Sequence, residues 1–223
     1  MTARKKSTHA RKPLDELKLR RTLLDAALGH VPFDGFSEKA LMQAASDVGV
    51  ERAVVERIFP DGAVSLVEAY SEVADREMET ALGKLELKRM KVRERIAAAV
   101  KARLDALRPH KEAARRAAAF LSLPPNLLLA SRLVFRTVDT MWRATGDRST
   151  DFNFYTKRAI LAGVWSSTLL RWFSDHSDGE TDTDKFLSAR IENVMQIEKM
   201  KAQLKNSLAK VPSPFTALGE FRR

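Results

Sequence analysis

Apolar residues recur at the spacing of an α-helix from Leu14 to Val211, and strand signals are nearly absent. The pattern predicts about nine helices separated by proline, glycine or acidic breaks. The first is expected from Pro13 to His30, with Gly29 near its end. The others are expected after the capping residue Ser37 up to Gly49, around 54–59, around 66–78, and at 92–107, 111–123, 127–143, 152–174 and 183–209. The sequence therefore predicts an all-α protein.

Four parts are predicted along the 223 residues. Residues 1–12 are expected to form a basic disordered tail, and residues 13–82 a helical head. Residues 83–209 are expected to form a larger helical body, and residues 210–223 a C-terminal tail containing two prolines. This length is sufficient for one helical domain, or for a small head fused to a larger body, with a substantial core.

Two predicted helices of the body are unusually apolar. In the first, Leu127, Leu128, Phe135 and Met141 contribute to a wide apolar face. The second, after Asp151, is apolar almost all round. Either the two helices form an ordinary core, or they line a cavity for an apolar ligand, as pockets between bundle helices commonly do.

The segment Gly35 to Glu68 resembles the N-terminal DNA-binding unit of TetR-family regulators. The resemblance rests on the capping Ser37, the small pair Ala44-Ala45, the turn at Gly49 and the closing run Ile58-Phe59-Pro60. It implies a TetR-like fold. Residues 37–58 nevertheless carry three basic and four acidic side chains, a net charge of −1, so this element lacks the main attraction for phosphates. Specific DNA binding is therefore not expected, although the basic N-terminal tail remains a second route to phosphates.

The run Asp139 to Arg158, DTMWRATGDRSTDFNFYTKR, resembles the most characteristic motif of the coenzyme Q biosynthesis lipid-binding family, the ninth of the COQ proteins. Residues 190–196 resemble that family's last conserved helix, and the whole resemblance covers about residues 14–200. The matching positions in the main motif are Asp139, Trp142, Gly146, Asp147, Ser149, Thr150, Asp151, Phe152, Tyr155, Thr156, Lys157 and Arg158.

The resemblance implies a TetR-like fold with a helix–turn–helix head and a C-terminal helical bundle that binds lipid. It also implies an accessory protein that forms a homodimer, touches membranes and partners the hydroxylase acting on demethoxyubiquinone. The chain departs from the family in two places. Phe154 stands where the family usually has Trp, and the tail after Ala209 is short and broken by Pro212 and Pro214, where fuller members carry an amphipathic helix.

Two sets of site residues follow from these patterns. A bound isoprenoid or phospholipid is expected in a space lined by some of Leu127, Leu128, Phe135, Met141, Leu161 and Trp165. The hydroxylase is expected to contact Asp139, Trp142, Phe154, Tyr155, Lys157 and Arg158.

Consecutive Phe154 and Tyr155 point about 100° apart on a helix, so one of them is expected at the surface. An exposed aromatic beside Lys157 and Arg158 has the composition of an interface anchor. The alternative is that Tyr155 packs internally while the two cations are solvated. In that interpretation Asp139 is also a solvated charge.

The net charge of +10 is unevenly distributed, because residues 1–21 carry eight basic and two acidic side chains. A second basic region, Lys84 to Arg116, is either a solvated helix face or a surface attracted to an anionic membrane or an acidic partner. We expect a peripheral membrane protein rather than an integral one, because no apolar run approaches the roughly twenty residues that a bilayer needs.

Chemistry-bearing patterns are scarce. The chain has no cysteine, its four histidines are scattered, and the acidic stretch 175–184 fails the calcium-loop pattern because Lys185 falls where the bidentate Glu should be. We expect no catalytic residue, no metal site and no cofactor besides a bound lipid. The expected location is cytoplasmic at the inner membrane, or the matrix side in a mitochondrion.

The favoured function is thus a non-enzymatic accessory protein of ubiquinone biosynthesis that presents an isoprenoid quinone intermediate to its hydroxylase. Two alternatives stay open. One is a TetR-type transcriptional regulator whose apolar body binds an inducer, and the other is a structural adaptor with a filled core.

Overall fold

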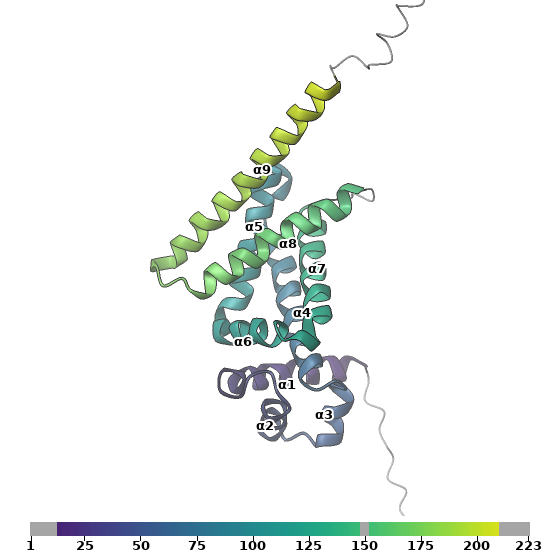
Figure 1. The fold of residues 1–223 in the computed structure, drawn as a ribbon. Coiled ribbons are helices and arrows are strands. Elements are labelled where there is room, and N and C mark those ends of the chain that lie inside the picture. The colour runs from purple at the N-terminus through teal and green to yellow at the C-terminus, as the bar shows by residue number, and fades with distance from the viewer. Residues whose placement is uncertain (1–12, 148–151, 210–223) are drawn as a thin grey trace, which may run out of the picture.

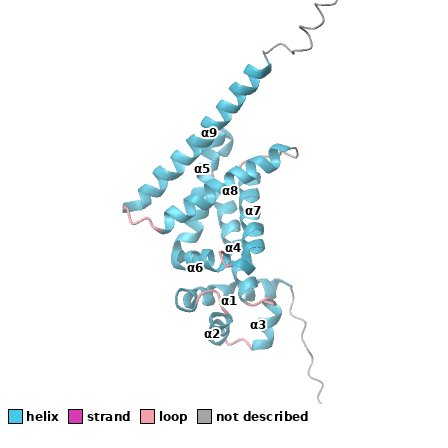
Figure 2. Ribbon diagram, in the orientation of Figure 1, coloured by secondary structure: helices cyan, strands magenta, loops and turns pink. Residues whose placement is uncertain are grey.

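The computed structural model describes residues 13–147 and 152–209, and side chains within 15–147 and 154–196. The predicted tails at 1–12 and 210–223 lie outside this range, as do the motif residues Ser149, Thr150 and Asp151. Within it, the all-α prediction is confirmed, and no strand occurs in the described ranges (Figure 2). Their α-helices are α1 (Pro13–Asp34), α2 (Glu38–Val48), α3 (Arg52–Ile58), α4 (Ala63–Leu82), α5 (Val92–Leu107), α6 (Lys111–Leu121), α7 (Leu127–Ala144), α8 (Phe152–Phe173) and α9 (Thr181–Ala209).

The turn of the helix–turn–helix forms as its residues predict. Ser37 caps α2 because its side-chain oxygen accepts a hydrogen bond from the Ala40 amide at 3.2 Å. Gly49 ends α2 in the left-handed conformation at φ 70°, which a residue without Cβ adopts without strain. Ala44 and Ala45 are buried, so α1 and α2 cross closely.

The predicted end of α1 was wrong. The helix continues through Gly29 and Pro32 to Asp34, and Gly35, at φ 68°, terminates it with a 2.8 Å bond from its amide to the Val31 carbonyl. Pro32 is tolerated because it removes only one backbone donor close to the helix end. Burial of Leu28 and Val31 in the head core supports this extra turn.

The head and the body are connected by α4, which runs from the helix–turn–helix into the bundle (Figure 1). There α4 packs on α5 and α7, α7 packs on α8, and α8 packs on α9. The helix α9 also contacts α5 and then runs on past the other helices (Figure 1). One continuous apolar core extends from Leu23 in the head to Leu187 in α9. The division at residue 82 therefore remains a prediction about sequence organisation.

By length and composition, no single helix in the described ranges could cross a bilayer. One bent pair, Val92–Leu121 with Pro124–Ala144, meets those criteria only when its two arms are taken together across a 96° bend.

Candidate functional site

The charged residues of the Asp139–Arg158 motif form a compact cluster where α7 meets α8. Asp139 Oδ1 accepts a hydrogen bond from Arg158 Nε at 2.7 Å and forms an ion pair with Nη2 at 2.6 Å. Arg158 Nη1 lies 3.1 Å from the Phe154 carbonyl oxygen and 3.5 Å from Asp147 Oδ2. Because the Arg158 side chain is only 2% exposed, the cluster holds the two helices together rather than facing solvent.

Trp142 and Lys157 add a second link between the same helices. The indole Nε1 of Trp142 donates to the Lys157 carbonyl oxygen at 3.1 Å, and Lys157 Nζ lies 5.5 Å from the indole ring centroid. Lys157 Nζ also donates to Asp147 Oδ1 at 2.8 Å. The indole is therefore held in one orientation by an intramolecular bond.

An aromatic row lies over this cluster. Phe154 is in the middle, with ring centroids 6.3 Å from Phe135 and 5.1 Å from Tyr155. The guanidinium carbon of Arg158 lies 3.4 Å from the Phe154 centroid, a close cation–π contact. The buried guanidinium of Arg158 thus packs against the inner face of the Phe154 ring. Tyr155 remains 67% exposed and Phe135 44% exposed.

A groove of about 580 Å³ runs along this face between α7 and α8. Small side chains form much of its lining, with Phe135 and Tyr155 as the large ones. We call it the α7–α8 groove. Its lining residues are Ala130, Ser131, Val134, Phe135, Val138, Tyr155, Arg158, Ala159 and Ala162.

The six residues predicted to contact the hydroxylase are brought together by the structure. The expectation that either Phe154 or Tyr155 is exposed is met by Tyr155. The alternative in which the cations and Asp139 are solvated is wrong for Arg158 and Asp139, whose side chains are 2% and 17% exposed. Only part of the set is therefore available for a partner, and Tyr155 is the most exposed member.

The six residues predicted to line a lipid site are not brought together in one space. Met141, Leu161 and Trp165 are buried in the core at 0–4% exposure, whereas Leu127, Leu128 and Phe135 are 44–87% exposed. The six residues therefore lie in two environments, because α7 turns one side of its apolar face inward and another outward, and a lipid space lined by some of them stays a prediction. Lipid binding itself stays a prediction.

The structure adds residues that the sequence interpretation missed. The groove alanines, Ala130, Ala159 and Ala162, carried no signal because small residues occur on every kind of helix face. Arg103, in contrast, could have been found from the sequence. It shares a helical stripe with Val100 and Leu107, positions at which a cation is normally excluded from the core.

In the head, all three cations of residues 37–58 are paired with carboxylates. Arg52 contacts Glu38 at 2.5 Å and Glu56 at 2.7 Å, so its guanidinium lies between two acids on the surface that would face phosphates. The other two pairs are Arg57 with Glu16 at 3.3 Å and Lys39 with Asp34 at 2.7 Å.

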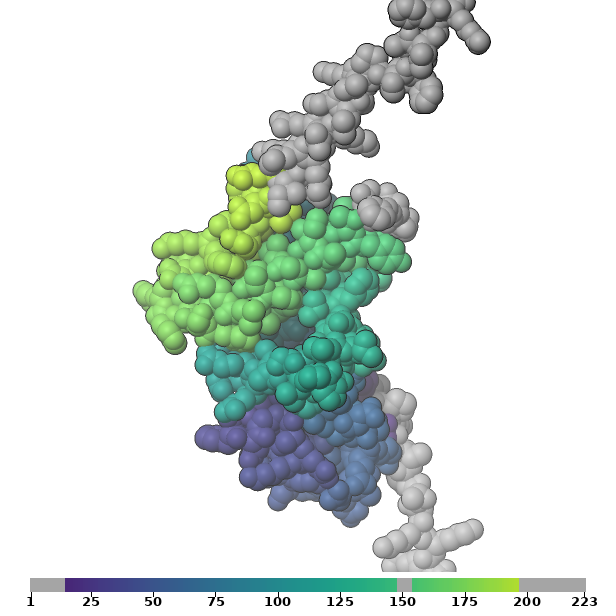
Figure 3. Space-filling model, viewed as in Figure 1, coloured from purple at the N-terminus to yellow at the C-terminus, as the bar shows by residue number. Residues whose placement is uncertain are grey.

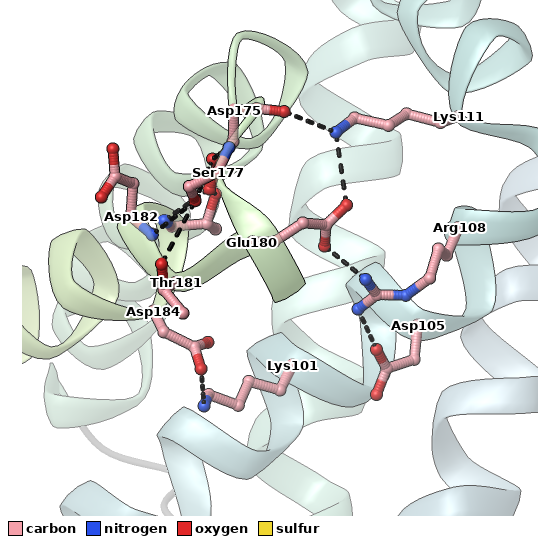
Figure 4. A network of polar contacts seen from close by, with 11 residues as sticks. Lys101, Asp105, Arg108, Lys111, Asp175, Ser177, Glu180, Thr181, Asp182 and Asp184 are labelled. Carbon is pink, nitrogen blue, oxygen red and sulfur yellow. Dashed lines mark hydrogen bonds and ion pairs between the residues drawn. The ribbon is translucent and has the colours of Figure 1, made fainter.

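The acidic stretch 175–184 forms a polar link between the start of α9 and the α5–α6 region (Figure 4). Asp175 accepts four hydrogen bonds, from the amides and hydroxyls of Ser177 and Thr183, at 2.6–2.8 Å. These bonds stabilise the carboxylate and hold the pKa of Asp175 well below its usual range. Four bonds reach the α5–α6 region, from Lys101 to Asp184, from Arg108 and Lys111 to Glu180, and from Lys111 to the Asp175 carbonyl oxygen.

In the described part of the chain, no three His, Asp or Glu side chains are grouped so that they could hold a metal ion. The acidic stretch instead caps and anchors a helix.

Comparison with known proteins identifies several relatives. A model of the COQ9 family matches residues 128–198, which includes the motif and the α7–α8 groove. The chain is 33% identical over 198 residues to "Ubiquinone biosynthesis protein COQ9, mitochondrial" of Rattus norvegicus, covering 86% of this chain and 64% of that protein. It is 34% identical over 198 residues to "Ubiquinone biosynthesis protein COQ9-B, mitochondrial" of Xenopus laevis, covering 85% of this chain and 67% of that protein. The chain thus spans slightly less than two thirds of the mammalian relative.

Among solved structures, the fold is similar to a TetR transcriptional regulator from Nitrosomonas europaea ATCC 19718. The TM-score is 0.62 at 19% identity, with 78% of this chain and 97% of that chain covered. At this identity the similarity confirms the predicted TetR-like fold and carries no further meaning.

Proposed function

The chain belongs to the COQ9 family, and from this membership we propose that it is a non-enzymatic, lipid-binding accessory protein of ubiquinone biosynthesis. Its specific task in this proposal is to present an isoprenoid quinone intermediate to a demethoxyubiquinone hydroxylase at the membrane surface. The observation that carries the proposal is the α7–α8 groove, an open apolar channel with the exposed Tyr155 in its lining.

The groove suits an isoprenoid tail because its lining is mostly aliphatic or aromatic and its volume of about 580 Å³ is in the range of small-molecule sites. Leu128 and Phe135, seven residues apart on α7, extend apolar surface along the same side of the helix, at 87% and 44% exposure. A tail lying there covers apolar surface that otherwise contacts water.

Tyr155 suits a protein partner for a different reason. Its ring packs on Phe154, which is itself held by Arg158, so the exposed aromatic is anchored without being buried. Rigid aromatic residues of this kind are typical anchors of protein interfaces. Tyr155 lines the groove, so a hydroxylase that covers Tyr155 also contacts a ligand bound there. The lipid can then pass directly from the groove to the hydroxylase.

The same proposal places the protein at a membrane surface as a peripheral homodimer. Isoprenoid quinones are too apolar to leave the bilayer unaided, and the basic region Lys84–Arg116 offers charge complementarity to anionic lipid. The vertebrate relatives are named as mitochondrial, so the matrix side of the inner membrane is the proposed site in a eukaryote, and the cytoplasmic side in a bacterium.

The test fills the groove and measures bound lipid. Ala159→Trp places a large ring in the groove from an exposed position, so folding should be preserved. Mass spectrometry of the purified protein should find an isoprenoid lipid in the unaltered chain and markedly less in the variant. Ala119→Trp, on the exposed side of α6, is the matched control and should retain the lipid. Equal lipid recovery from both variants, or none from the unaltered protein, contradicts the proposal.

A further inference from the structure

A charged cluster lies inside the body, in the otherwise apolar layer between α4, α5 and α7. Arg103 is at its centre and is only 4% exposed, and Asp75 from α4 is 5% exposed. Arg103 Nε lies 3.0 Å from Asp75 Oδ1, and its Nη2 donates at 3.3 Å to the carbonyl and hydroxyl oxygens of Ser71. Its Nη1 has no hydrogen-bond partner among the described residues. Part of a buried guanidinium is therefore left with an unused donor.

The carboxylate of Asp75 does not accept a hydrogen bond from Nη1. Its Oδ1 already accepts a hydrogen bond from the Thr137 hydroxyl at 2.9 Å, and its Oδ2 faces Arg136 Nε at 3.4 Å. Asp75 therefore pairs with Arg103 through Oδ1 alone, and its Oδ2 has no hydrogen-bond partner among the described residues.

The cluster carries an excess positive charge. Its three arginines, Arg20, Arg103 and Arg136, face two carboxylates, Glu72 and Asp75, which leaves one positive charge. Desolvation alone would raise the pKa of Glu72, but Arg20 and Arg136 hold that pKa below its usual range, so Glu72 is ionised. Burial lowers the pKa of Arg103, but a guanidinium stays protonated at any pH at which proteins fold.

A cavity of about 90 Å³ adjoins Arg103. Arg103 lines this cavity together with Ser71, Thr137 and Trp165, and the Trp165 ring centroid lies 5.8 Å from the guanidinium carbon. The remaining lining is almost entirely apolar, and consists of Val67, Tyr70, Leu107, Ala114, Ala117, Ala118, Leu121, Leu133, Val134 and Leu169.

The cavity reaches the surface between α6, α7 and α8. Its lining residues Ala118, Leu121, Val134 and Leu169 are only partly buried, while Arg103 and Trp165 are buried. Figure 3 shows the surface hollowed between the green residues of α8 and the teal residues of α6 and α7. The polar end is therefore deep and the apolar end is near solvent.

We propose that this cavity binds an apolar carboxylic acid, with the carboxylate against Arg103 and the hydrocarbon chain leading out between α6, α7 and α8. This ligand site goes beyond the proposed function, because of all the residues that line it only Val134 also lines the α7–α8 groove. A carboxylate matches the site in charge and in hydrogen bonding, since it offsets the excess positive charge and can accept from the Arg103 guanidinium.

The size of the cavity agrees with this ligand. Apolar cavities of about 150 Å³ admit a benzene ring, and this one, at about 90 Å³, has room for a carboxylate and the first methylene groups but not for a substituted ring. The rest of the ligand's hydrocarbon chain must occupy the hollow at the surface. A slim, flexible acid fits this shape better than a quinone head group does.

The experiment compares octanoate with 1-octanol on the full-length protein, using titration calorimetry. The two probes share an eight-carbon chain and differ in the charged head. We expect one octanoate per chain and binding of 1-octanol weaker by about tenfold or more, the difference given by a hydrogen bond to a charged group. Equal affinities, or no octanoate binding, overturn the proposal.

Two variant pairs locate the site. Arg103→Met keeps the length of the side chain without its charge and should abolish the preference for octanoate, while Arg93→Met, at an exposed position of the same helix, should not change it. If Arg103→Met fails to fold because Asp75 loses its partner, Ala118→Leu decides. Ala118→Leu narrows the cavity near its opening, so this variant should no longer bind octanoate. Ala119→Leu, on the exposed side of α6, should bind octanoate normally.

The outcome is separable from that of the proposed function. Isoprenoid recovery is measured on the same four variants, and we expect all four to retain it. Octanoate binding that survives in both Arg103→Met and Ala118→Leu overturns the acid site whatever happens to the isoprenoid. Loss of isoprenoid from Ala159→Trp with octanoate binding intact shows that the two sites are distinct.

Discussion

The head and the α7–α8 face use charged residues in opposite ways. In the head, Arg52 is paired at the surface with Glu38 and Glu56, so a helix–turn–helix of good geometry presents little free positive charge. At the α7–α8 face, Arg158 is paired with Asp139 beneath the surface, and the pair supports an exposed aromatic residue. Pairing thus reduces the free positive charge at the surface of the head and supports an exposed aromatic residue at the α7–α8 face. A TetR-like fold is compatible with either use.

The largest effect should come from removing the buried carboxylate. Asp139→Ala leaves the Arg158 guanidinium, 2% exposed, with the more distant Asp147 as its carboxylate in the described ion pairs, and should cost about 3 kcal/mol of unfolding free energy. Urea denaturation measures it. Asp105→Ala, which breaks the exposed pair with Arg108, is the control and should change stability by less than about 1 kcal/mol. Similar small losses for both variants would mean that the cluster does not support the α7–α8 face.

A smaller effect, confined to binding, should follow truncation of the exposed aromatic. Tyr155→Ala should weaken binding of a demethoxyubiquinone hydroxylase by about 1–2 kcal/mol, the range for an aromatic anchor, with unfolding free energy nearly unchanged. Co-purification and calorimetry measure the first, and urea denaturation the second. Leu170→Ala is the matched control, because Leu170 lies on the same helix and is 65% exposed, and it should leave hydroxylase binding intact. A Tyr155→Ala protein with full affinity would remove Tyr155 from the interface.

The body should also respond to acid through Asp175. Its pKa is lowered in the folded state, so its contribution to stability is complete above the unfolded value near 3.8 and is lost as the pH falls below that value. Asp175→Asn should therefore lower the melting temperature at pH 6, and the difference from the unaltered protein should shrink below about pH 4. Melting curves between pH 3 and 6 test this. A difference that does not depend on pH would mean that the carboxylate charge is irrelevant to the link in Figure 4.

The smallest effect should be on non-specific DNA binding by the head, when the ion pairs of Arg52 with Glu38 and Glu56 are removed. Glu38→Gln with Glu56→Gln releases Arg52, and the salt dependence of non-specific duplex DNA binding should steepen by about one unit of log–log slope. The unaltered protein should recover no specific palindrome from genomic DNA at moderate salt. Recovery of one palindrome, lost on replacing Arg52 and Arg57, would instead support a transcriptional regulator.

Helix content and helix order followed from the sequence because the period of apolar residues is a local property. Ser37 and Gly49 marked a helix start and end through chemistry that acts within a few residues. The end of α1 was missed because Gly29 resembles a stop signal, whereas burial of Leu28 and Val31 against the rest of the head outweighs it. The motif at 139–158 identified the family, and its described residues come together because they lie on α7 and α8, which pack on each other.

Only the tertiary structure decided which of those residues face outward. Helical period states which side chains share a face, but it does not state which face another helix will cover. Leu128 and Met141 belong to one apolar pattern in sequence, yet packing of α8 and α4 on α7 buries the second and leaves the first 87% exposed. The same holds for Arg103, whose pairing with Asp75 depends on the packing of α5 against α4. Burial and electrostatics are set by such contacts, and local sequence does not contain them.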